Sequence, residues 1–501
     1  MTNWADRAAA LTPETRLFID GEFRPALDGA TFDTIAPRDG SLIAAVSAGG
    51  TADVDLAVRA ASRAFEAGIW SRADRRERAR VMLRLSELML EDLDELALLE
   101  SLDSGHPIGD ARRVDVPNAA RTMRWYAEAI DKMYDEIAPA PQNALALVTR
   151  EPLGVIGAVV PWNYPLIITA WKIAPALAAG NSVVLKPAEL TSLSALRLAE
   201  LAARAGLPAG VFNVVPGLGS VAGEALGRHP LVDKITFTGS PAVGRKFLSY
   251  AGESNGKQVA LELGGKSPQV VLADVEDLAA CASAVAWGIF YNAGQTCHGG
   301  SRLIVDERVH DELVSEVIAA GDSMVLGDPL DDATQIGSIA SAIQLDRVLG
   351  YTAVARDEGI SVHGGDRVRP EGLAEGFYVE PTVFTGVDNS GRIGQEEIFG
   401  PALAVSKVRG PADAVRVAND SAYGLAASVW TREVTTAHRV AQQLRAGTVW
   451  VNTYDVADVI TPFGGFKSSG SGRDRSLHAF DSYTALKTTW INLGNSPLTN
   501  D

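Results

Sequence analysis

The 501-residue chain has only two cysteines, Cys281 and Cys297. Two thiols cannot form a disulfide framework, and such scarcity is typical of a reducing compartment, so we expect a cytoplasmic protein. No apolar run approaches the length that a membrane span needs. The N-terminal sequence MTNWADRAAALTPETR also lacks the basic-then-apolar pattern of a signal peptide, so we do not expect export.

Positive charge is scarce as well. The chain has 45 Lys and Arg residues against 62 Asp and Glu residues, which gives a formal net charge of −17. Phosphates would be repelled, so we expect neither a nucleic-acid partner nor an anionic membrane surface. A hydrophobic fraction of 47% with 21% charged residues is typical of a globular protein, and the length suits two or three domains.

The chain then divides into regions of different periodicity. Apolar residues at helical spacing predict amphipathic helices over 52–67, 74–100 and 115–134, the last ended by Pro139 to Pro141. From Gly154 onward, short β-rich runs alternate with helical patterns. The runs are 155–160, 182–185, 211–215, 235–238 and 259–263, and the helical patterns are 165–179, 192–205, 219–228 and 241–251. This alternation predicts an α/β fold with a doubly wound parallel sheet, covered by helices on both faces.

A second alternation starts at Val270 and continues through 302–305, 402–405 and 448–451. It predicts a second α/β region. The final stretch, 482–493, alternates like an edge strand, and we expect it to pair with another subunit.

Two glycine turns are candidates for binding a dinucleotide. Residues 217–222 (GLGSVA) fit G-x-G-x-x-A after a strand, and residues 239–244 (GSPAVG) follow the strand KITFT. Both turns place free backbone N–H groups at the positive end of a helix, where phosphates bind. Glycine turns are also common for tight turning alone, so the pattern does not choose between them.

Three polar residues are candidates for catalysis. Cys297 lies in NAGQTC, a small glycine-broken loop that suits an exposed nucleophile, although free cysteine is usually buried and inert. Glu262, in LELGGK at a strand end, is either a general base or a salt-bridged carboxylate. Asn163, in PWNYP, is either an oxyanion donor or the start of an Asx-turn. Cys281 lies in the apolar run LAACASAVAWGIF, where we expect an inert core residue.

Seven motifs carry a resemblance to a known family. PWNYP, KPAE, FTGS, LELGGK, GQTC, EEIFGP and PFGGFKSSG occur in the order and spacing of the NAD(P)-dependent aldehyde dehydrogenase superfamily, over nearly the whole chain. GRDRSLHAFDSYTALKTTWINL and RWYAEAIDKMYDEIAP resemble the 4-(γ-glutamylamino)butanal dehydrogenases of putrescine breakdown. The resemblance implies an NAD-binding domain (1–134 and 153–266), a catalytic domain (267–475), a small β oligomerisation extension (135–152 and 476–501) and no metal.

The resemblance also implies a catalytic route. Cys297 attacks the aldehyde, the amide of Asn163 and the backbone N–H of Cys297 hold the oxyanion, and hydride loss leaves a thioester. Glu262 activates the water that hydrolyses this thioester. Relatives that pass the acyl group to coenzyme A generally lack this glutamate, so we expect a free carboxylic acid as product.

The cofactor residues follow in the same way. The turn 239–244 matches the family's pyrophosphate turn, which leaves 217–222 beside the adenine. Glu189 should repel a 2′-phosphate, so we expect NAD to be preferred, with NADP as the alternative. The implied cofactor-binding residues are Trp162, Lys186, Glu189, Gly219, Gly239, Ser240, Gly244, Leu263, Glu397 and Phe399.

The implied aldehyde funnel is lined by Tyr164, Trp171, Tyr291, Thr296, His298, Asp455, Asp458 and Phe463. Asp455 and Asp458 either attract an ammonium group, which suits an amino- or γ-glutamylamino-aldehyde, or are solvated loop residues. His298 suggests a Cys–His dyad, but adjacent residues of an extended chain point to opposite faces, so we interpret it as a wall residue. Asp474 stands where many relatives have Glu, and we interpret it as a feature of the branch.

Other functions remain open from the sequence. A broad-specificity aldehyde dehydrogenase has the same motifs. A cofactor-free cysteine hydrolase would use Cys297 and Glu262 but leaves KPAE, FTGS and EEIFGP unexplained, and a non-catalytic relative leaves the three polar residues unexplained. The family is usually a dimer or a dimer of dimers, and we expect a homotetramer.

Overall fold

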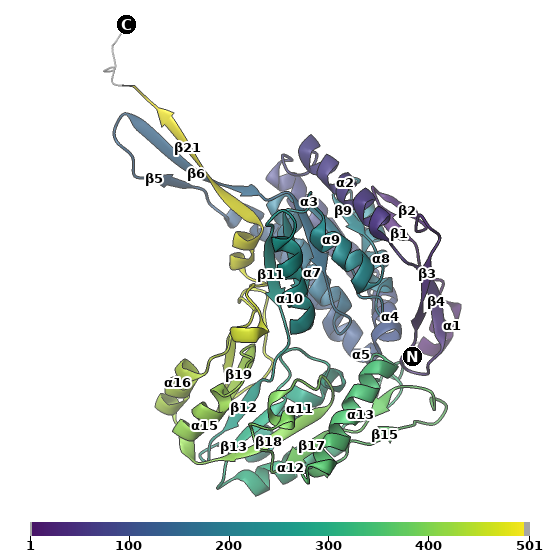
Figure 1. Cartoon of the computed structure of the whole chain (residues 1–501), viewed down its shortest axis with the longest axis vertical. Helices are drawn as coiled ribbons and strands as arrows, with labels where there is room; N and C mark the ends of the chain where they lie inside the picture. The colour runs from purple at the N-terminus through teal and green to yellow at the C-terminus, as the bar shows by residue number, and fades with distance from the viewer. Residues whose placement is uncertain (1–2, 495–501) are drawn as a thin grey trace.

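The computed structural model describes residues 3–494 and has two large sheets and a projecting arm (Figure 1). Small two-stranded sheets pair β3 (Thr31–Ile35) with β4 (Leu42–Ser47) and β15 (Arg367–Val368) with β16 (Tyr378–Val379). Short helices include α1 (Trp4–Ala10), α5 (Ile108–Asp110) and α14 (Arg392–Gln395). Within the described residues, no helix combines the length and hydropathy required to traverse a bilayer.

The first sheet is the doubly wound sheet that the sequence predicts. In spatial order its strands are β11 (Gln258–Glu262), β10 (Lys234–Thr238), β7 (Val155–Val159), β8 (Ser182–Lys186), β9 (Phe212–Val214), β1 (Leu17–Ile19) and β2 (Glu22–Arg24). The first five run parallel, and β1 and β2 close the far edge in antiparallel pairing. The parallel strands therefore end at the same edge of the sheet, which is where ligands bind in this type of fold.

Helices cover both faces of this sheet, so its central strand β7 is buried at every position rather than at alternate ones. In β7, Val155 and Val159 pack with one set of helices, and Ile156 and Ala158 pack with the other. The first set is α2 (Thr51–Ala67), α9 (Glu224–Arg228) and α10 (Pro241–Gly252). The second is α3 (Arg75–Glu91), α4 (Leu93–Ser104), α6 (Val116–Ala129), α7 (Pro165–Ala179) and α8 (Leu193–Arg204).

The second sheet has the order β14 (Ser361–His363), β17 (Thr382–Thr385), β18 (Ala402–Val408), β13 (Arg302–Asp306), β12 (Pro268–Val271), β19 (Ala426–Trp430) and β20 (Thr448–Val451). All pairs are parallel except β14 with β17. One face packs on α11 (Leu278–Phe290), α12 (His310–Asp322) and α13 (Ala342–Asp357), and the other on α15 (Gly410–Asn419) and α16 (Val434–Gln443). The predicted second α/β region is thus a second parallel sheet.

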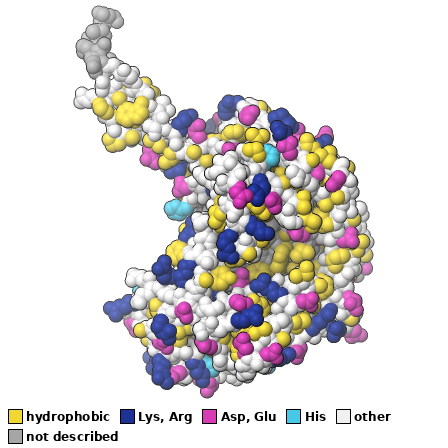
Figure 2. Space-filling view, viewed as in Figure 1, with side chains coloured by type: hydrophobic (Ala, Val, Ile, Leu, Met, Phe, Trp, Pro, Cys, Tyr) yellow, Lys and Arg dark blue, Asp and Glu magenta, His cyan; other side chains and the backbone are white. Residues whose placement is uncertain are grey.

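The arm is a three-stranded antiparallel sheet of β5 (Glu136–Ala138), β6 (Ala144–Pro152) and β21 (Thr484–Asn492). The predicted edge strand pairs along its whole length with β6 of its own chain, and its other edge is free. Large hydrophobic side chains of this strand, including Leu486 and Trp490, are exposed, and Figure 2 shows hydrophobic side chains gathered on the arm.

Three predicted helices differ from the observed ones. The pattern over 74–100 is broken at Asp92, whose carboxylate accepts two hydrogen bonds from Arg197, so α3 and α4 are separate helices. The helix predicted over 115–134 ends at Lys132 with a 3-10 turn, and β5 lies between it and the prolines that were expected to end it. The helix predicted over 219–228 begins with a π-type turn over Gly219–Gly223.

Candidate active site

The loop that carries Cys297 is held in an unusual backbone conformation. Asn292 and Ala293 have φ values of 49° and 51°, a left-handed region that side chains with a Cβ rarely adopt. Gly294 follows with φ of 69°, and a Cβ at this position would lie 1.9 Å from the carbonyl oxygen of Gly400. The loop therefore packs against the EEIFGP segment, and the local chain direction is set by contacts rather than by propensity.

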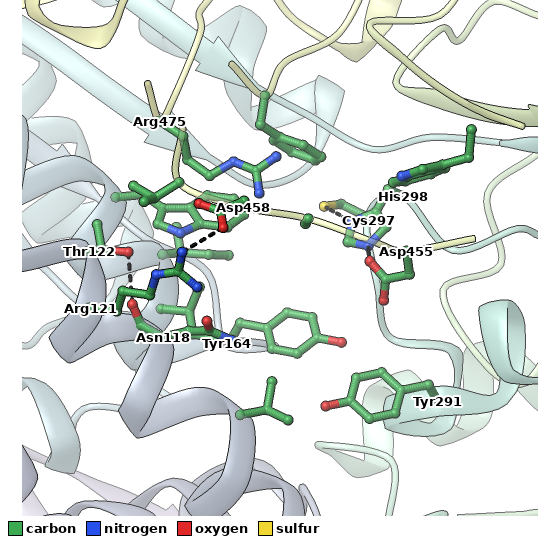
Figure 3. Close-up of a pocket in the computed structure, with 18 residues that line it drawn as sticks. Asn118, Arg121, Thr122, Tyr164, Tyr291, Cys297, His298, Asp455, Asp458 and Arg475 are labelled. Carbon is green, nitrogen blue, oxygen red and sulfur yellow. Dashed lines mark hydrogen bonds and ion pairs between the residues drawn. The ribbon is translucent and has the colours of Figure 1, made fainter. Parts of the chain in front are cut away.

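Cys297 lies where two cavities meet. Among the described residues it is the one that borders both the cavity shown in Figure 3, here called the aldehyde cavity after the predicted funnel, and a second cleft beside α10. Its side chain is half-buried, whereas Cys281 is fully buried in α11, where burial raises the pKa of its thiol to about 12. The two cysteines thus have opposite environments, as the sequence predicts.

Glu262 ends β11 and is buried, and neither of its carboxylate oxygens has a hydrogen-bond partner among residues 3–494. A Cβ on Gly464 would lie 2.6 Å from one of these oxygens, so a glycine is needed beside the carboxylate. Burial raises the pKa of Glu262 well above its ordinary value, and the charges of Asp474 and Cys297 add to the effect, against the opposing charge of Lys172. A buried carboxyl with spare acceptor capacity suits proton transfer.

Asn163 is hydrogen-bonded to the loop that carries Cys297. Its side-chain amide donates to the carbonyl of Gln295 at 2.8 Å, and Asn292 donates to the Asn163 carbonyl at 3.0 Å. Asn163 is buried, and it borders the same cleft as Cys297. The side-chain amide has a second N–H, which is the donor that an oxyanion at this place would need.

The second cleft lies at the carboxyl ends of the parallel strands, where α10 begins. Its lining residues are Pro161, Trp162, Asn163, Thr238, Gly239, Ser240, Leu263, Gly264, Cys297, Gln344, Arg347, Glu397 and Phe399. Ser240 is the N-cap of α10, so the helix presents free N–H groups to the cleft.

The residues of this cleft fit a dinucleotide. A Cβ on Gly239 would lie 2.5 Å from the Phe237 ring, and a Cβ on Gly264 would lie 2.0 Å from a Glu397 oxygen, so glycine at both positions leaves room for these two side chains. Glu397 accepts from the Gly265 N–H, while burial raises the pKa of its carboxyl to about 7. The Thr238 hydroxyl is buried with no partner in the described structure. The cleft therefore offers a glycine cradle, a helix N-terminus and unused polar atoms.

Four predicted cofactor residues lie outside the cleft lining. Lys186 and Glu189 form an ion pair of 2.9 Å at the end of β8, and the N–H of Gly219 faces Glu189. Gly244 lies in α10, where a Cβ would meet Leu263 at 2.8 Å. Lys186, Glu189 and Gly219 thus form a separate polar group, which lies beyond the cleft along the same sheet edge. Gln344 and Arg347 were not predicted; both come from α13 and bond to the backbone of the EEIFGP segment.

Comparison with known proteins decides the family. The model of the aldehyde dehydrogenase family matches residues 23–489. This chain belongs to the aldehyde dehydrogenase family. Its fold class and its activity, the oxidation of aldehydes, are thereby those that the motifs predict.

Individual relatives are similar over almost their whole length. The chain is 48% identical to the NADP/NAD-dependent aldehyde dehydrogenase PuuC of Escherichia coli (strain K12) over 490 residues, 98% of each chain. It is 50% identical to the aminoacetaldehyde dehydrogenase of Pseudomonas aeruginosa over 489 residues, 97% of this chain and 98% of the relative. The crystal structure of the γ-glutamyl-γ-aminobutyraldehyde dehydrogenase from Burkholderia cenocepacia J2315 has 54% identity and a TM-score of 0.96, covering 98% and 99%.

In this aldehyde dehydrogenase, the aldehyde cavity collects seven of the eight predicted funnel residues. These are Tyr164, Trp171, Tyr291, His298, Asp455, Asp458 and Phe463. The prediction was wrong for Thr296, which does not line the cavity. Its side chain is buried, and its hydroxyl pairs with the Tyr164 hydroxyl at 2.7 Å.

The structure also corrects the predicted orientation of His298 relative to Cys297. The N–H of Gly299 donates to the carbonyl of Thr296, so the chain turns at Cys297 and His298 instead of running extended. The His298 ring nitrogen Nδ1 then lies 3.7 Å from the Cys297 sulfur, on the same side. His298 lines the cavity as predicted, but its separation from the nucleophile was wrongly inferred.

Both acidic residues of the cavity have protein partners (Figure 3). An Asp455 carboxylate oxygen lies 2.6 Å from His298 Nε2. Burial alone would lower the pKa of His298, but the negative charge of Asp455 outweighs it, so this pKa is raised to about 10. Asp458 accepts from Arg121 at 2.5 Å. Neither is therefore a simply solvated loop residue, and the attraction of an ammonium group by either carboxylate stays a prediction.

Several buried charges were missed. Lys172 is the one charged residue of α7 and donates to Asp474 at 2.7 Å, with both side chains buried. A single lysine in an otherwise apolar helix was a signal for such a pair. Arg121 and Arg475, which border the aldehyde cavity, have no comparable signature in the sequence.

Proposed function

We propose that Cys297 is the nucleophile of this aldehyde dehydrogenase, with Asn163 as oxyanion donor and Glu262 as general base. The observation that carries this proposal is the position of Cys297 at the junction of the two cavities. An aldehyde that enters one cavity and a nicotinamide cofactor in the other would meet at its sulfur. Trp162, Gly239, Ser240, Leu263, Glu397 and Phe399 would hold the cofactor.

In the acylation half, the Cys297 sulfur bonds to the aldehyde carbon, and the carbonyl oxygen becomes an oxyanion. The free amide N–H of Asn163 and the backbone N–H of Cys297 donate to it, and one such donor typically contributes about 3 kcal/mol. When bound, the nicotinamide cofactor supplies the acceptor for the hydride. Loss of that hydride from the tetrahedral carbon leaves a thioester on Cys297.

In the deacylation half, Glu262 takes a proton from water, and the resulting hydroxide oxygen bonds to the thioester carbon. The carbon–sulfur bond then breaks, which releases a carboxylic acid and the Cys297 thiolate. Burial and the neighbouring charges make the Glu262 carboxylate a stronger base than an exposed one, because they raise its pKa.

For the cofactor, we propose NAD in preference to NADP. Glu189 is paired with Lys186 at the sheet edge and offers a carboxylate that would repel a 2′-phosphate. Comparison of kcat/KM with the two cofactors tests this preference, and a clear preference for NADP would overturn it.

For the substrate, we propose an aliphatic aldehyde that carries an amino or γ-glutamylamino group. Two of the relatives support this class by their names: one is an aminoacetaldehyde dehydrogenase and the other acts on γ-glutamyl-γ-aminobutyraldehyde. In this chain, the aromatic walls formed by Tyr164, Trp171 and Phe463 suit an aliphatic chain. Turnover across a panel of amino-, γ-glutamylamino-, fatty and aromatic aldehydes tests the class.

For the assembly, we propose a cytoplasmic homo-oligomer, a tetramer in preference to a dimer, formed through the arm. The free edge of β21 and its exposed hydrophobic side chains support an intermolecular contact there. We also propose a division of the chain into three domains. The NAD-binding domain comprises residues 1–134 and 153–266, the catalytic domain residues 267–475, and the oligomerisation extension residues 135–152 and 476–501. The mass of the purified protein by light scattering tests the assembly.

The experiment that tests the whole proposal mixes purified protein, NAD and hexanal. We expect reduced nicotinamide absorbance to appear, and its complete loss after alkylation of Cys297. In a parallel mixture with a hexanoyl thioester in place of hexanal, hydrolysis of the thioester together with no reduction of NAD by hexanal would favour the cysteine hydrolase instead.

A further inference from the structure

The aldehyde cavity contains one charged side chain that no protein group neutralises. Arg121 pairs with Asp458, and His298 pairs with Asp455. Arg475 also borders the cavity but forms no ion pair or side-chain hydrogen bond within residues 3–494, and its Nε–H is buried without a partner. The nearest alternative, Asp474, is occupied by Lys172. The uncompensated charge of the cavity is therefore positive.

The guanidinium of Arg475 is held in place by aromatic rings and by the backbone. Its central carbon lies 5.0 Å from the Trp171 ring centre and 4.9 Å from that of Phe463, which are cation–π distances. The residue is 5% exposed and has a left-handed backbone with φ of 63°. Figure 3 shows the guanidinium directed into the cavity, on the side of Cys297.

A buried guanidinium with unused donors needs an acceptor. Burial lowers the pKa of Arg475, against the opposing charges of Asp474 and Asp455, but an arginine stays protonated at neutral pH. Its N–H groups can only donate, so a carbonyl or carboxylate oxygen of the substrate would satisfy them, whereas an ammonium group would be repelled.

We propose that Arg475 selects aldehydes whose chain carries an oxygen acceptor, an amide carbonyl or a carboxylate, over aldehydes that carry a free ammonium group. This inference rests on the proposed function and narrows its substrate class. Acylation of an amino-aldehyde removes the positive charge and adds the acceptor in one step, so N-acylated amino-aldehydes are favoured over the corresponding free amines.

The test measures kcat/KM with NAD for four aldehydes. 3-Aminopropanal carries a cation, N-acetyl-3-aminopropanal an amide, 4-oxobutanoate a carboxylate, and hexanal neither an acceptor nor a charge. For the native enzyme we expect the N-acetyl compound to exceed its free amine by about tenfold or more, the scale of one hydrogen bond to a charged group.

Substitution then assigns the selectivity to one side chain. Arg475→Leu should lower the ratio of N-acetyl-3-aminopropanal to 3-aminopropanal by about tenfold. The change with hexanal reports the loss of packing on Trp171 and Phe463. Arg409→Gln is the matched control, because Arg409 is an exposed arginine paired with Glu307 on the second sheet.

The variant Arg475→Lys distinguishes the two possible acceptors, a carboxylate and an amide carbonyl. If Arg475→Lys restores activity with 4-oxobutanoate alone, the site holds a carboxylate by charge. If Arg475→Lys loses activity with both 4-oxobutanoate and N-acetyl-3-aminopropanal, the acceptor is held by the two parallel donors of the guanidinium. Either result supports the proposal. A ratio that stays within about twofold of native in Arg475→Leu overturns it, since a charged hydrogen bond contributes more than that.

A measurement on the native enzyme keeps the proposal falsifiable if the variants do not fold. Butyrate should inhibit hexanal oxidation competitively, and n-butylammonium should not. Equal or stronger inhibition by n-butylammonium overturns the role of Arg475. Absence of NAD reduction with every aldehyde, hexanal included, would instead refute the proposed function itself.

Discussion

The second cleft beside α10, to which we assign the dinucleotide, and the aldehyde cavity share Cys297 but are built differently. Most residues that line the cleft lie in short motifs at strand ends and at the start of α10, and Gln344 and Arg347 of α13 complete it. The cavity is built from side chains of separate segments, and its charges pair across long sequence separations. Arg121 and Asp458 are 337 residues apart, and His298 and Asp455 are 157 apart. The cleft thus depends mostly on short motifs, whereas the aldehyde cavity depends on contacts between distant segments of the chain.

The most damaging change to this arrangement is at the shared sulfur. Cys297→Ser should lower kcat by about a thousandfold or more, because the hydroxyl is a far weaker nucleophile at neutral pH. Binding of NAD, followed by quenching of tryptophan fluorescence, should remain, since the other residues that line the cleft are unchanged. Cys281→Ser is the control, and equal losses in the two variants would contradict the assignment.

Removal of the buried carboxylate should separate the two half-reactions. In Glu262→Gln, steady-state turnover should fall by about a hundredfold or more, the usual contribution of a general base. A first equivalent of NADH should still form if Glu262 acts only in deacylation. Loss of both the burst and the steady state would assign Glu262 to the deprotonation of Cys297 as well.

The pH dependence of native turnover follows from the same carboxyl. The pKa of Glu262 is raised, and the base works only when deprotonated, so kcat should rise with pH through that raised pKa. Glu262→Gln should abolish this rise. A native profile that is flat from weakly acidic to weakly basic pH would contradict a buried base.

A change beyond the cleft should alter cofactor choice by a smaller factor. Glu189→Ser removes the carboxylate that faces the Gly219 N–H, and the ratio of kcat/KM for NADP over NAD should rise by about tenfold. An unchanged ratio would show that the polar group at the end of β8 lies away from the 2′-position.

The smallest effect is expected at the mouth of the aldehyde cavity. Asp458→Asn frees Arg121, so KM for 3-aminopropanal should rise by about two- to threefold and KM for hexanal should not. The effect should shrink in high salt, because Arg121 is 58% exposed. A large, salt-independent rise would mean that Asp458 binds the ammonium directly.

The same contrast explains which features the sequence could predict. The apolar strands, the two glycine turns and the environments of Cys281 and Cys297 follow from local patterns, and the structure agrees with them. The partners of Asp455 and Asp458 could not be predicted, because each lies on a segment remote in sequence. The turn at His298 and the burial of Thr296 behind Tyr164 depend on the packed loop, which propensity does not describe.

The differences from the predicted helices, and the missed buried charge of α7, involve contacts between distant residues that periodicity does not describe. Asp92 interrupts an otherwise continuous amphipathic pattern because Arg197, on another helix, holds its carboxylate. Lys172 was visible as a lone charge in α7, but its partner Asp474 is 302 residues away. The sequence therefore indicates that a buried charge exists without indicating where it is neutralised.

The proposed role of Cys297 is tested most directly by identifying the residue that carries the covalent acyl group. Glu262→Gln enzyme is mixed with NAD and hexanal, quenched in acid and digested, and its peptides are weighed by mass spectrometry. We expect the mass of one hexanoyl group on the peptide that contains Cys297, formed only when NAD is present. A hexanoyl group on another residue, or none despite a burst of NADH, would contradict the central role of Cys297.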